Sequence, residues 1–316
     1  MARPLIHKSL APIALFIYRR PEHTRKTVES LLACAQSAES PIFVFADGPK
    51  SASDVARCEA TRSVARELLG DRAVYIERET NIGLANSIVA GVTDLCESHG
   101  KVIVIEDDLL LAPNFLKYMN RALDFYVDDD QVMQISGHMF NVPSLARGNQ
   151  AVFLSLTTSW GWATWKRAWD QFDLDPVGWQ ESIQDQSFCK AFDMDGNYPY
   201  SRMLTQQMTV GIDTWDIQWY YTVFAKRGMV LFPPTTLVRN HGMDRTGTHG
   251  RLVRYRRYPP TFSTVSCEFP VQISLPANTA AIYQEIGKDM AGTRTDTIRS
   301  LVLTAASILK SRSLRA

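Results

Sequence analysis

The segment KVIVIEDD, residues 101–108, decides the fold class of this chain. Its four consecutive β-branched residues predict a strand that is covered on both faces, which is typical of parallel sheets. The strand runs directly into Glu106, Asp107 and Asp108. Three adjacent carboxylates repel one another unless a positive group joins them. This strand end therefore predicts a site that takes up a positively charged partner.

Strands and helices alternate along the chain before this segment. Apolar runs predict strands at 12–18, 41–48 and 73–78. Apolar residues at helical spacing predict helices that begin at Pro21, near Ser53 and at Gly83. Because strands that alternate with helices of this length form βαβ units, we expect an α/β, Rossmann-like fold with a mostly parallel sheet flanked by helices.

Polar residues follow each of the four predicted strands. They are Arg19-Arg20, Asp47, the turn 79–83 and the carboxylates 106–108. The carboxyl ends of parallel strands meet at one edge of a sheet, and ligands bind there. We therefore expect these four sets to form one site.

The second half of the sequence differs from the first in its composition and pattern of elements. Short strands are expected at 132–137 and 151–156, and all seven tryptophans lie between Trp160 and Trp219. No linker rich in Gly, Ser or Pro separates the halves. We expect a single domain over 1–290, with a first half at about 10–130 and an aromatic-rich second half at about 131–260 packed onto it.

Composition excludes several classes of protein. The net charge of +1 gives no indication of a nucleic-acid partner. The five cysteines are scattered without zinc-site spacing, which favours reduced thiols. The start of the sequence lacks the apolar core of a secretory signal, and no run approaches the length of a membrane span. We expect a cytoplasmic protein.

The C-terminal segment 291–316 has apolar residues at helical spacing and five basic residues against one acidic residue, Asp296. Such a basic amphipathic helix either lies on an anionic membrane surface or packs on its own domain with a solvated tail. The membrane contact would be peripheral, at the inner face.

The carboxylates 106–108 suit a hard divalent cation, Mn²⁺ or Mg²⁺. Alternate residues of an extended segment face opposite ways, so Glu106 and Asp108 can share a side that Asp107 does not. Such ions take one or two protein carboxylates and complete their shell with phosphate oxygens and water. The alternative is an acidic turn that is simply solvated.

Six blocks of the sequence, in order over about 12–250, resemble the nucleotide-diphospho-sugar glycosyltransferases of the GT-A fold. The similarity is to bacterial family 2-like sugar transferases and to N-acetylglucosaminyltransferase I. The blocks are LFIYRRPEHTRKTVESL (15–31), FADGP (45–49), NIGLANSIVAGV (81–92), VIVIEDDLLLAPNFLKYM (102–119), SWGWATWKRAWDQFD (159–173) and NHGMDRTGTHG (240–250). Motifs of kinases, dehydrogenases and hydrolases (GxxxxGKS, GxGxxG, GxSxG) are absent.

The resemblance implies a role for each residue at the sheet edge. Residues 106–108 match the acidic DXD-type motif, with Asp108 the metal ligand and Glu106 and Asp107 contacting ribose or donor sugar. Asp47 matches the residue that reads the nucleotide base. Arg19 and Arg20 lie where the first strand opens onto the nucleotide.

Several further positions have competing interpretations. Asn81 and Gly83 match donor-site positions, or they form only a turn and a helix N-cap. His249 matches a late histidine that GT-A enzymes supply to the metal or diphosphate. Relatives carry a glycine where this chain has Arg245, and His241 is a second candidate ligand there.

Asp216 is the candidate general base, because it resembles the Trp-Asp segment that carries the base in N-acetylglucosaminyltransferase I. We expect Asp213 to cap the helix that follows, which places Asp216 in its first turn, where the helix dipole favours a carboxylate. The alternatives are that Asp213 is the base or that both residues are helix-start chemistry.

The tryptophans fall into two groups with different interpretations. Trp162, Trp165 and Trp169 fall on one face of a helix, which indicates core packing. Trp160 and Trp215 lie near expected loop–helix junctions, where they either offer flat faces to a sugar ring or pack in the core.

The resemblance, together with the acidic strand end, implies a metal-dependent, inverting hexosyl- or N-acetylhexosaminyltransferase. It would move a sugar from a nucleotide-diphosphate donor, UDP-sugar favoured, to a glycan or lipid-linked acceptor in polysaccharide or glycoconjugate biosynthesis. The alternatives are a sugar nucleotidyltransferase, although the Gly-rich loop it needs after the first strand is absent, and a non-catalytic glycan-binding protein of the same fold.

Overall fold

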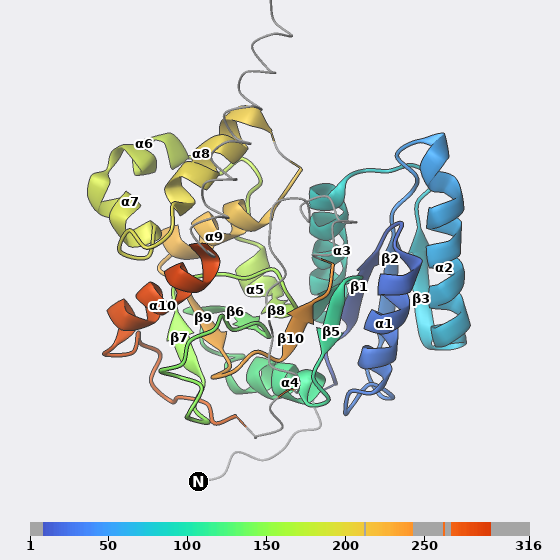
Figure 1. Cartoon of the computed structure of the whole chain (residues 1–316), viewed down its shortest axis with the longest axis horizontal. Coiled ribbons are helices and arrows are strands. Elements are labelled where there is room, and N and C mark those ends of the chain that lie inside the picture. The colour runs from blue at the N-terminus through green and yellow to red at the C-terminus, as the bar shows by residue number, and fades with distance from the viewer. Residues whose placement is uncertain (1–8, 212, 243–261, 263–266, 292–316) are drawn as a thin grey trace, which may run out of the picture.

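A computed structural model describes residues 9–211, 213–242, 262 and 267–291. Its centre is an eight-stranded sheet with the strand order β3-β2-β1-β4-β8-β6-β9-β7, accompanied by a two-stranded sheet of β10 and β5. Helices cover the large sheet, as Figure 1 shows. The predicted α/β class is confirmed.

The first half consists of βαβ units, as predicted. Its strands are β1 (Ile13–Ile17), β2 (Ile42–Ala46), β3 (Ala73–Glu77) and β4 (Lys101–Glu106). Its helices are α1 (Pro21–Leu32), α2 (Val55–Leu69) and α3 (Leu84–His99), with short 3₁₀ turns η1 (Ala52–Asp54) and η2 (Gly70–Arg72). The four strands are parallel to one another, with Ile13 opposite both Ile42 and Ile103.

The sheet is buried on both faces because side chains of a strand alternate between them. Ala14 and Phe16 of β1 pack with α3 and the aromatic second half. Ile13, Leu15 and Ile17 pack with α1 and α4 (Phe115–Phe125) on the other face. This two-sided burial explains why the strands are nearly continuous apolar runs.

The second half extends the same sheet with mixed strand directions. Its strands are β6 (Val132–Ser136), β7 (Val152–Leu154), β8 (Trp162–Trp165) and β9 (Met229–Phe232), and the small sheet contains β5 (Leu109–Leu111) and β10 (Val238–Asn240). β8 lies antiparallel between β4 and β6 and so joins the two halves.

One prediction for this half is wrong. Trp162 and Trp165 belong to β8 and not to a helix, and Trp169 follows in the short α5 (Lys166–Trp169). All three are buried, as expected of core residues. A strand that is covered on both faces buries every residue, so the spacing of buried tryptophans could not distinguish it from a helix.

The remaining helices form a layer beside the second half of the sheet, with α6 to α9 grouped together in Figure 1. They are α6 (Trp179–Gln184), α7 (Gln186–Phe192), α8 (Tyr200–Val210), α9 (Asp216–Ala225) and α10 (Thr279–Ala291). Ile282 and Ile286 of α10 are fully buried against this layer. Within the described residues, no helix has the length and apolar character of a membrane span. The predicted membrane-contacting segment falls almost entirely on residues 292–316, which lie outside them.

Candidate functional site

The carboxyl ends of β1 and β4 meet, as the sequence predicted. Asp107 and Asp108 form the turn between β4 and β5, directly beside the end of β1. The backbone N–H of Tyr18 donates to Asp107 Oδ2 at 3.0 Å, and Arg20 Nη1 donates to Asp108 Oδ2 at 3.0 Å. Thr27 of α1 also donates its hydroxyl to the Asp107 carbonyl at 2.8 Å. The acidic turn is therefore held by the first strand and by the helix that follows it.

Arg20 also joins the acidic turn to the end of β10. Its Nη2 donates to the carbonyl of Gly242 at 3.0 Å, while Asn240 Nδ2 donates to Asp108 Oδ1 at 3.3 Å. A Cβ on Gly242 would lie 2.6 Å from Arg20 Nη1 and would also collide with Asp108. This close approach requires glycine at position 242.

The charges of the acidic turn are only partly compensated. Burial raises the pKa of Glu106 well above its usual value, and repulsion from Asp108, Asp107 and Asp216 adds to the effect. Burial, followed by repulsion from Asp108, raises the pKa of Asp107 to about 7. Burial also raises the pKa of Asp108, although Arg20 opposes it. One guanidinium does not neutralise this cluster, so a further positive charge would be strongly favoured there.

Asp216 faces the same cluster from the second half of the chain. It begins α9, and its charge contributes to the raised pKa of Glu106. Asp216 Oδ1 accepts bonds from the Thr214 hydroxyl and from the backbone N–H of Ile217. No hydrogen bond from another described residue reaches Oδ2. The predicted position in the first turn of a helix is confirmed, and one oxygen of the carboxylate can accept a proton.

Asp213 does not cap α9, so that expectation is wrong. Its carboxylate crosses to α3, where Oδ2 accepts from the backbone N–H of Leu84 and Oδ1 from that of Ala85, each at 3.0 Å. Gly83, the N-cap residue of α3, has φ +87° and would place a Cβ 2.8 Å from Asp213 Oδ2. The segment that carries Asp216 is thereby attached to the first half of the molecule.

Asp47 holds the turn that precedes α3. The side chain is 7% exposed, and its two oxygens accept from the backbone N–H of Ile82 at 3.1 and 3.3 Å and from Asn81 Nδ2 at 2.8 Å. Gly48 donates its N–H to Asp47 Oδ1 at 2.9 Å. Asn81 and Gly83 do form a turn and an N-cap, and a donor-site role for them stays a prediction. The predicted contact of Asp47 with a nucleotide base would come in addition to these bonds.

The two arginines after β1 bind different partners. Arg20 joins the acidic turn, whereas Arg19 Nη1 pairs with Asp54 Oδ1 of η1 at 2.5 Å. The Tyr18 hydroxyl donates to the same carboxylate at 3.3 Å. The Arg19 side chain is 41% exposed, so it borders the site without entering the acidic cluster.

The two tryptophans considered for a sugar contact differ in their burial. Trp215 is 2% exposed and stacks on Trp162 with ring centroids 5.0 Å apart, so of the two alternatives for this residue the structure has core packing and not a free face for a sugar. Its ring turned inward because Trp162, Trp169 and Trp219 form an aromatic core beneath α9. Trp160 is half-buried, with its ring centroid 4.6 Å from that of His138. A sugar contact by Trp160 stays a prediction.

The candidate histidines lie at the end of β10 and beyond it. His249 lies outside the described residues. The backbone N–H of His241 donates to the Asp108 carbonyl at 2.9 Å, and its ring stacks on His23 with centroids 4.7 Å apart. His23 also lowers the pKa of Asp108. Sequence reasoning missed His23, although its place in the first turn of α1, just after the end of β1, could have indicated it.

The acidic turn suits one kind of metal site. In the described part of the chain, no group of three or more His, Cys, Asp or Glu side chains could hold a metal by itself. Mg²⁺-like ions are commonly bound by one or two carboxylates and completed by phosphate oxygens. The carboxylates of the turn are half-buried and repel one another, so they fit an ion of this kind that binds together with a phosphorylated ligand.

Comparisons with known proteins give structural likenesses only. No family model matches the sequence, and no curated protein matches it. A mannosyltransferase from Pyrobaculum calidifontis in complex with GDP-Man and Mn²⁺ matches with a TM-score of 0.38 and 8% identity, over 68% of this chain and 69% of that one.

Two further solved structures match with a TM-score of 0.34. The galactosyltransferase LgtC, in complex with donor and acceptor sugar analogs, is 11% identical over 67% of this chain and 70% of its own. Glucosyl-3-phosphoglycerate synthase from Mycobacterium tuberculosis, in complex with Mn²⁺, UDP and glucosyl-3-phosphoglycerate, is 12% identical over 56% of this chain and 67% of its own. At such scores no function transfers from these proteins, and the site geometry must carry the interpretation.

Proposed function

We propose that this protein is a metal-dependent glycosyltransferase that moves a sugar from a nucleotide-diphosphate donor to a glycan or lipid-linked acceptor. The observation that carries the proposal is the acidic turn Glu106–Asp108 at the carboxyl edge of the parallel strands. Its carboxylates are half-buried, and their pKa values are raised by burial and mutual repulsion. A diphosphate bound with a divalent cation supplies both the positive charge and the oxygen ligands that complete such a site.

The residues that would hold Mn²⁺ or Mg²⁺ are Asp108 and one neighbouring carboxylate of the turn. Asp108 is fixed by Arg20 and Asn240, so its orientation is set before a ligand arrives. When bound, the ion offsets the negative charge that develops on the departing diphosphate. Arg20 lies beside the same position, and its guanidinium can pair with a phosphate as well as with Asp108.

Asp216 is the proposed general base. In an inverting transfer the acceptor hydroxyl attacks the anomeric carbon directly, and a carboxylate must take its proton. Asp216 fits because it approaches the acidic turn from the opposite half of the molecule, with Oδ1 fixed by Thr214 and Ile217. The attachment of Asp213 to α3 holds this segment against the donor half.

The proposal is tested by titrating the protein with UDP and with GDP, in the presence and absence of Mn²⁺. We expect binding that requires the metal and that is lost in Asp108→Ala, and the preferred nucleotide identifies the base of the donor. Asp71→Ala removes an exposed carboxylate from η2 and serves as the matched control. Tight nucleotide binding that is indifferent both to Mn²⁺ and to Asp108→Ala would overturn the proposal.

A further inference from the structure

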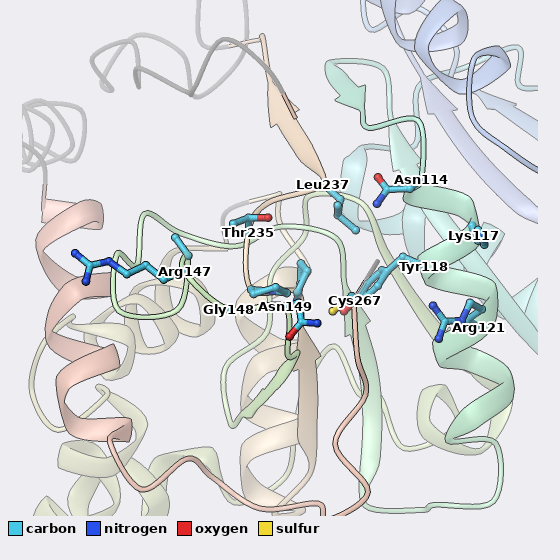
Figure 2. A pocket seen from close by; sticks show the side chains of 13 residues that line it. Asn114, Lys117, Tyr118, Arg121, Arg147, Gly148, Asn149, Thr235, Leu237 and Cys267 are labelled. Carbon is cyan, nitrogen blue, oxygen red and sulfur yellow. The ribbon is translucent and has the colours of Figure 1, made fainter. Parts of the chain in front are cut away.

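A pocket of about 380 Å³ lies at the start of α4, away from the acidic turn. It is shown in Figure 2, between the first turns of α4 and the loops that precede β7 and follow β9. Its volume is in the range of small-molecule sites. The described residues that line it include Lys117, Arg121 and Arg147 and no acidic side chain. The pocket is therefore electropositive.

Tyr118 contributes a hydrogen-bond donor to this pocket. The residue is 4% exposed, and within the described residues its buried hydroxyl has no hydrogen-bond partner. In Figure 2 its side chain reaches from α4 toward Cys267. Burial raises the pKa of Tyr118 well above its usual value, so the O–H is retained at neutral pH. A buried donor without an acceptor is unfavourable, and an acceptor atom of a ligand would remove that cost.

The N-terminus of α4 strengthens the same preference. This eleven-residue helix has no acidic residue in its first turn, and the side chain of Asn114, its N-cap residue, makes no capping hydrogen bond. The N–H of Phe115 donates to the carbonyl of Ala112 at 2.9 Å, and the amides that follow it, with the helix dipole, present a positive end that no first-turn carboxylate offsets. Lys117 and Arg121, four residues apart, lie on one face of the helix beside it. Arg147, by contrast, points away from α4 in Figure 2 and is left out of the binding set.

The pocket is connected to the acidic turn by the two-stranded sheet of β5 and β10. At the pocket end Leu111 pairs with Val238, and at the other end Leu109, next to Asp108, pairs with Asn240. The backbone N–H of Ala112 donates to Leu237, which lines the pocket, at 2.8 Å. Two steps of an extended strand separate the outer pairs by roughly 7 Å. Asn114, the N-cap residue of α4 and the first to line the pocket, comes three residues after Leu111, so an acceptor must extend beyond this span to reach the acidic turn.

We propose that this pocket binds a phosphoryl group, and that the group belongs to the acceptor, which is a phosphate-linked carbohydrate. Lys117 and Arg121 supply charge, the first turn of α4 supplies backbone N–H groups, and the Tyr118 hydroxyl donates to a phosphate oxygen. The assignment to the acceptor rests on the proposed glycosyltransferase function. The binding of phosphate does not.

The test is isothermal titration calorimetry at low ionic strength with inorganic phosphate as the probe. We expect saturable binding that weakens by about tenfold or more in Tyr118→Phe and in the double variant Lys117→Ala/Arg121→Ala, since each loses a hydrogen bond or ion pair to a charged group. Lys190→Ala, which removes an exposed cation on α7, should bind as the wild type does. No saturable binding, or binding unchanged in both pocket variants, would overturn the proposal.

Two further titrations distinguish the sources of the phosphate. Glucose 1-phosphate that binds more tightly than inorganic phosphate indicates a soluble sugar phosphate acceptor. Farnesyl phosphate in detergent micelles, with farnesol micelles as the control, indicates a lipid-linked acceptor if it binds more tightly. Metal-dependent UDP or GDP binding without phosphate binding refutes the pocket alone. Phosphate binding without nucleotide binding refutes the glycosyltransferase and leaves the pocket.

Discussion

The attachment of Asp213 to α3 predicts a measurable link between stability and turnover. Asp213→Ala removes the acceptor from two first-turn N–H groups, those of Leu84 and Ala85. Loss of a side-chain N-cap costs typically about 1 kcal/mol, and because Asp213 is exposed, water replaces part of what is lost. We expect the free energy of unfolding to fall by about 1 kcal/mol, measured by urea unfolding followed by circular dichroism.

The same change should affect the reaction more than stability. Asp213 precedes Asp216 by three residues, so its release frees the segment that positions the proposed base. Misplacement of a reacting group by about 1 Å can lower a rate by roughly a hundredfold. We expect kcat to fall by at least about tenfold in a sugar-transfer assay, with little change in Mn²⁺-dependent nucleotide affinity, because Asp213 does not contact the acidic turn.

Asp213→Asn is the matched control, since an asparagine oxygen caps helices about as well as a carboxylate. It keeps one acceptor oxygen for the two N–H groups, so its stability and turnover should lie between those of Asp213→Ala and the wild type. If Asp213→Ala unfolds at the same urea concentration as the wild type, the cap does not form in solution and the reasoning fails. If stability falls and kcat does not, the cap is structural and does not position Asp216.

Three other predictions concern the acidic turn and the pocket. Gly242→Ala should weaken Mn²⁺-dependent nucleotide binding by about tenfold or more in a calorimetric titration, because its Cβ displaces Arg20 from Asp108. Unchanged affinity would mean that the Arg20–Asp108 ion pair is not needed for nucleotide binding. In metal-free protein, the pKa values of Glu106 and Asp107 are raised, so between about pH 4 and 7 the folded state binds more protons than the unfolded state. The free energy of unfolding should therefore fall as pH rises over that range, and Glu106→Gln should flatten the profile. A free energy of unfolding that rises with pH in the wild type would contradict this direction. Tyr118→Phe should raise the free energy of unfolding by about 1 kcal/mol in urea, because it removes a buried donor that lacks a partner; a decrease would show that the hydroxyl is paired in solution.

Much of the site was predictable because it lies at strand ends. The apolar runs of β1, β2 and β4 determine where the strands stop, and parallel strands place their carboxyl ends at one edge. Arg20 and Asp108 therefore lie in contact as expected, although 88 residues separate them in the sequence. Asp216 was predictable as a first-turn residue from the helix that follows it.

Other residues were predictable only in part. The burial of Trp215 was one of two alternatives, and a single aromatic ring at a loop–helix junction has no periodicity that would decide between them. Gly242 owes its place in the site to the end of β10, which reaches the acidic turn from the other half of the chain. His23 lies there because α1 begins just after β1, and its ring stacks on His241. The pocket at α4 likewise has walls from four separate segments, none of which has a motif.

The sequence by itself determined the βαβ half, the edge at which polar residues gather and the unfavourable concentration of carboxylates at 106–108. These follow from local backbone preference and from the alternation of buried side chains, which act over a few residues. The tertiary structure decided that β8 lies between β4 and β6, that Asp213 caps a helix whose first residue lies 129 positions away, and that Asp216 faces Glu106. Such contacts depend on how the second half packs across the first, and no local pattern of residues encodes that arrangement.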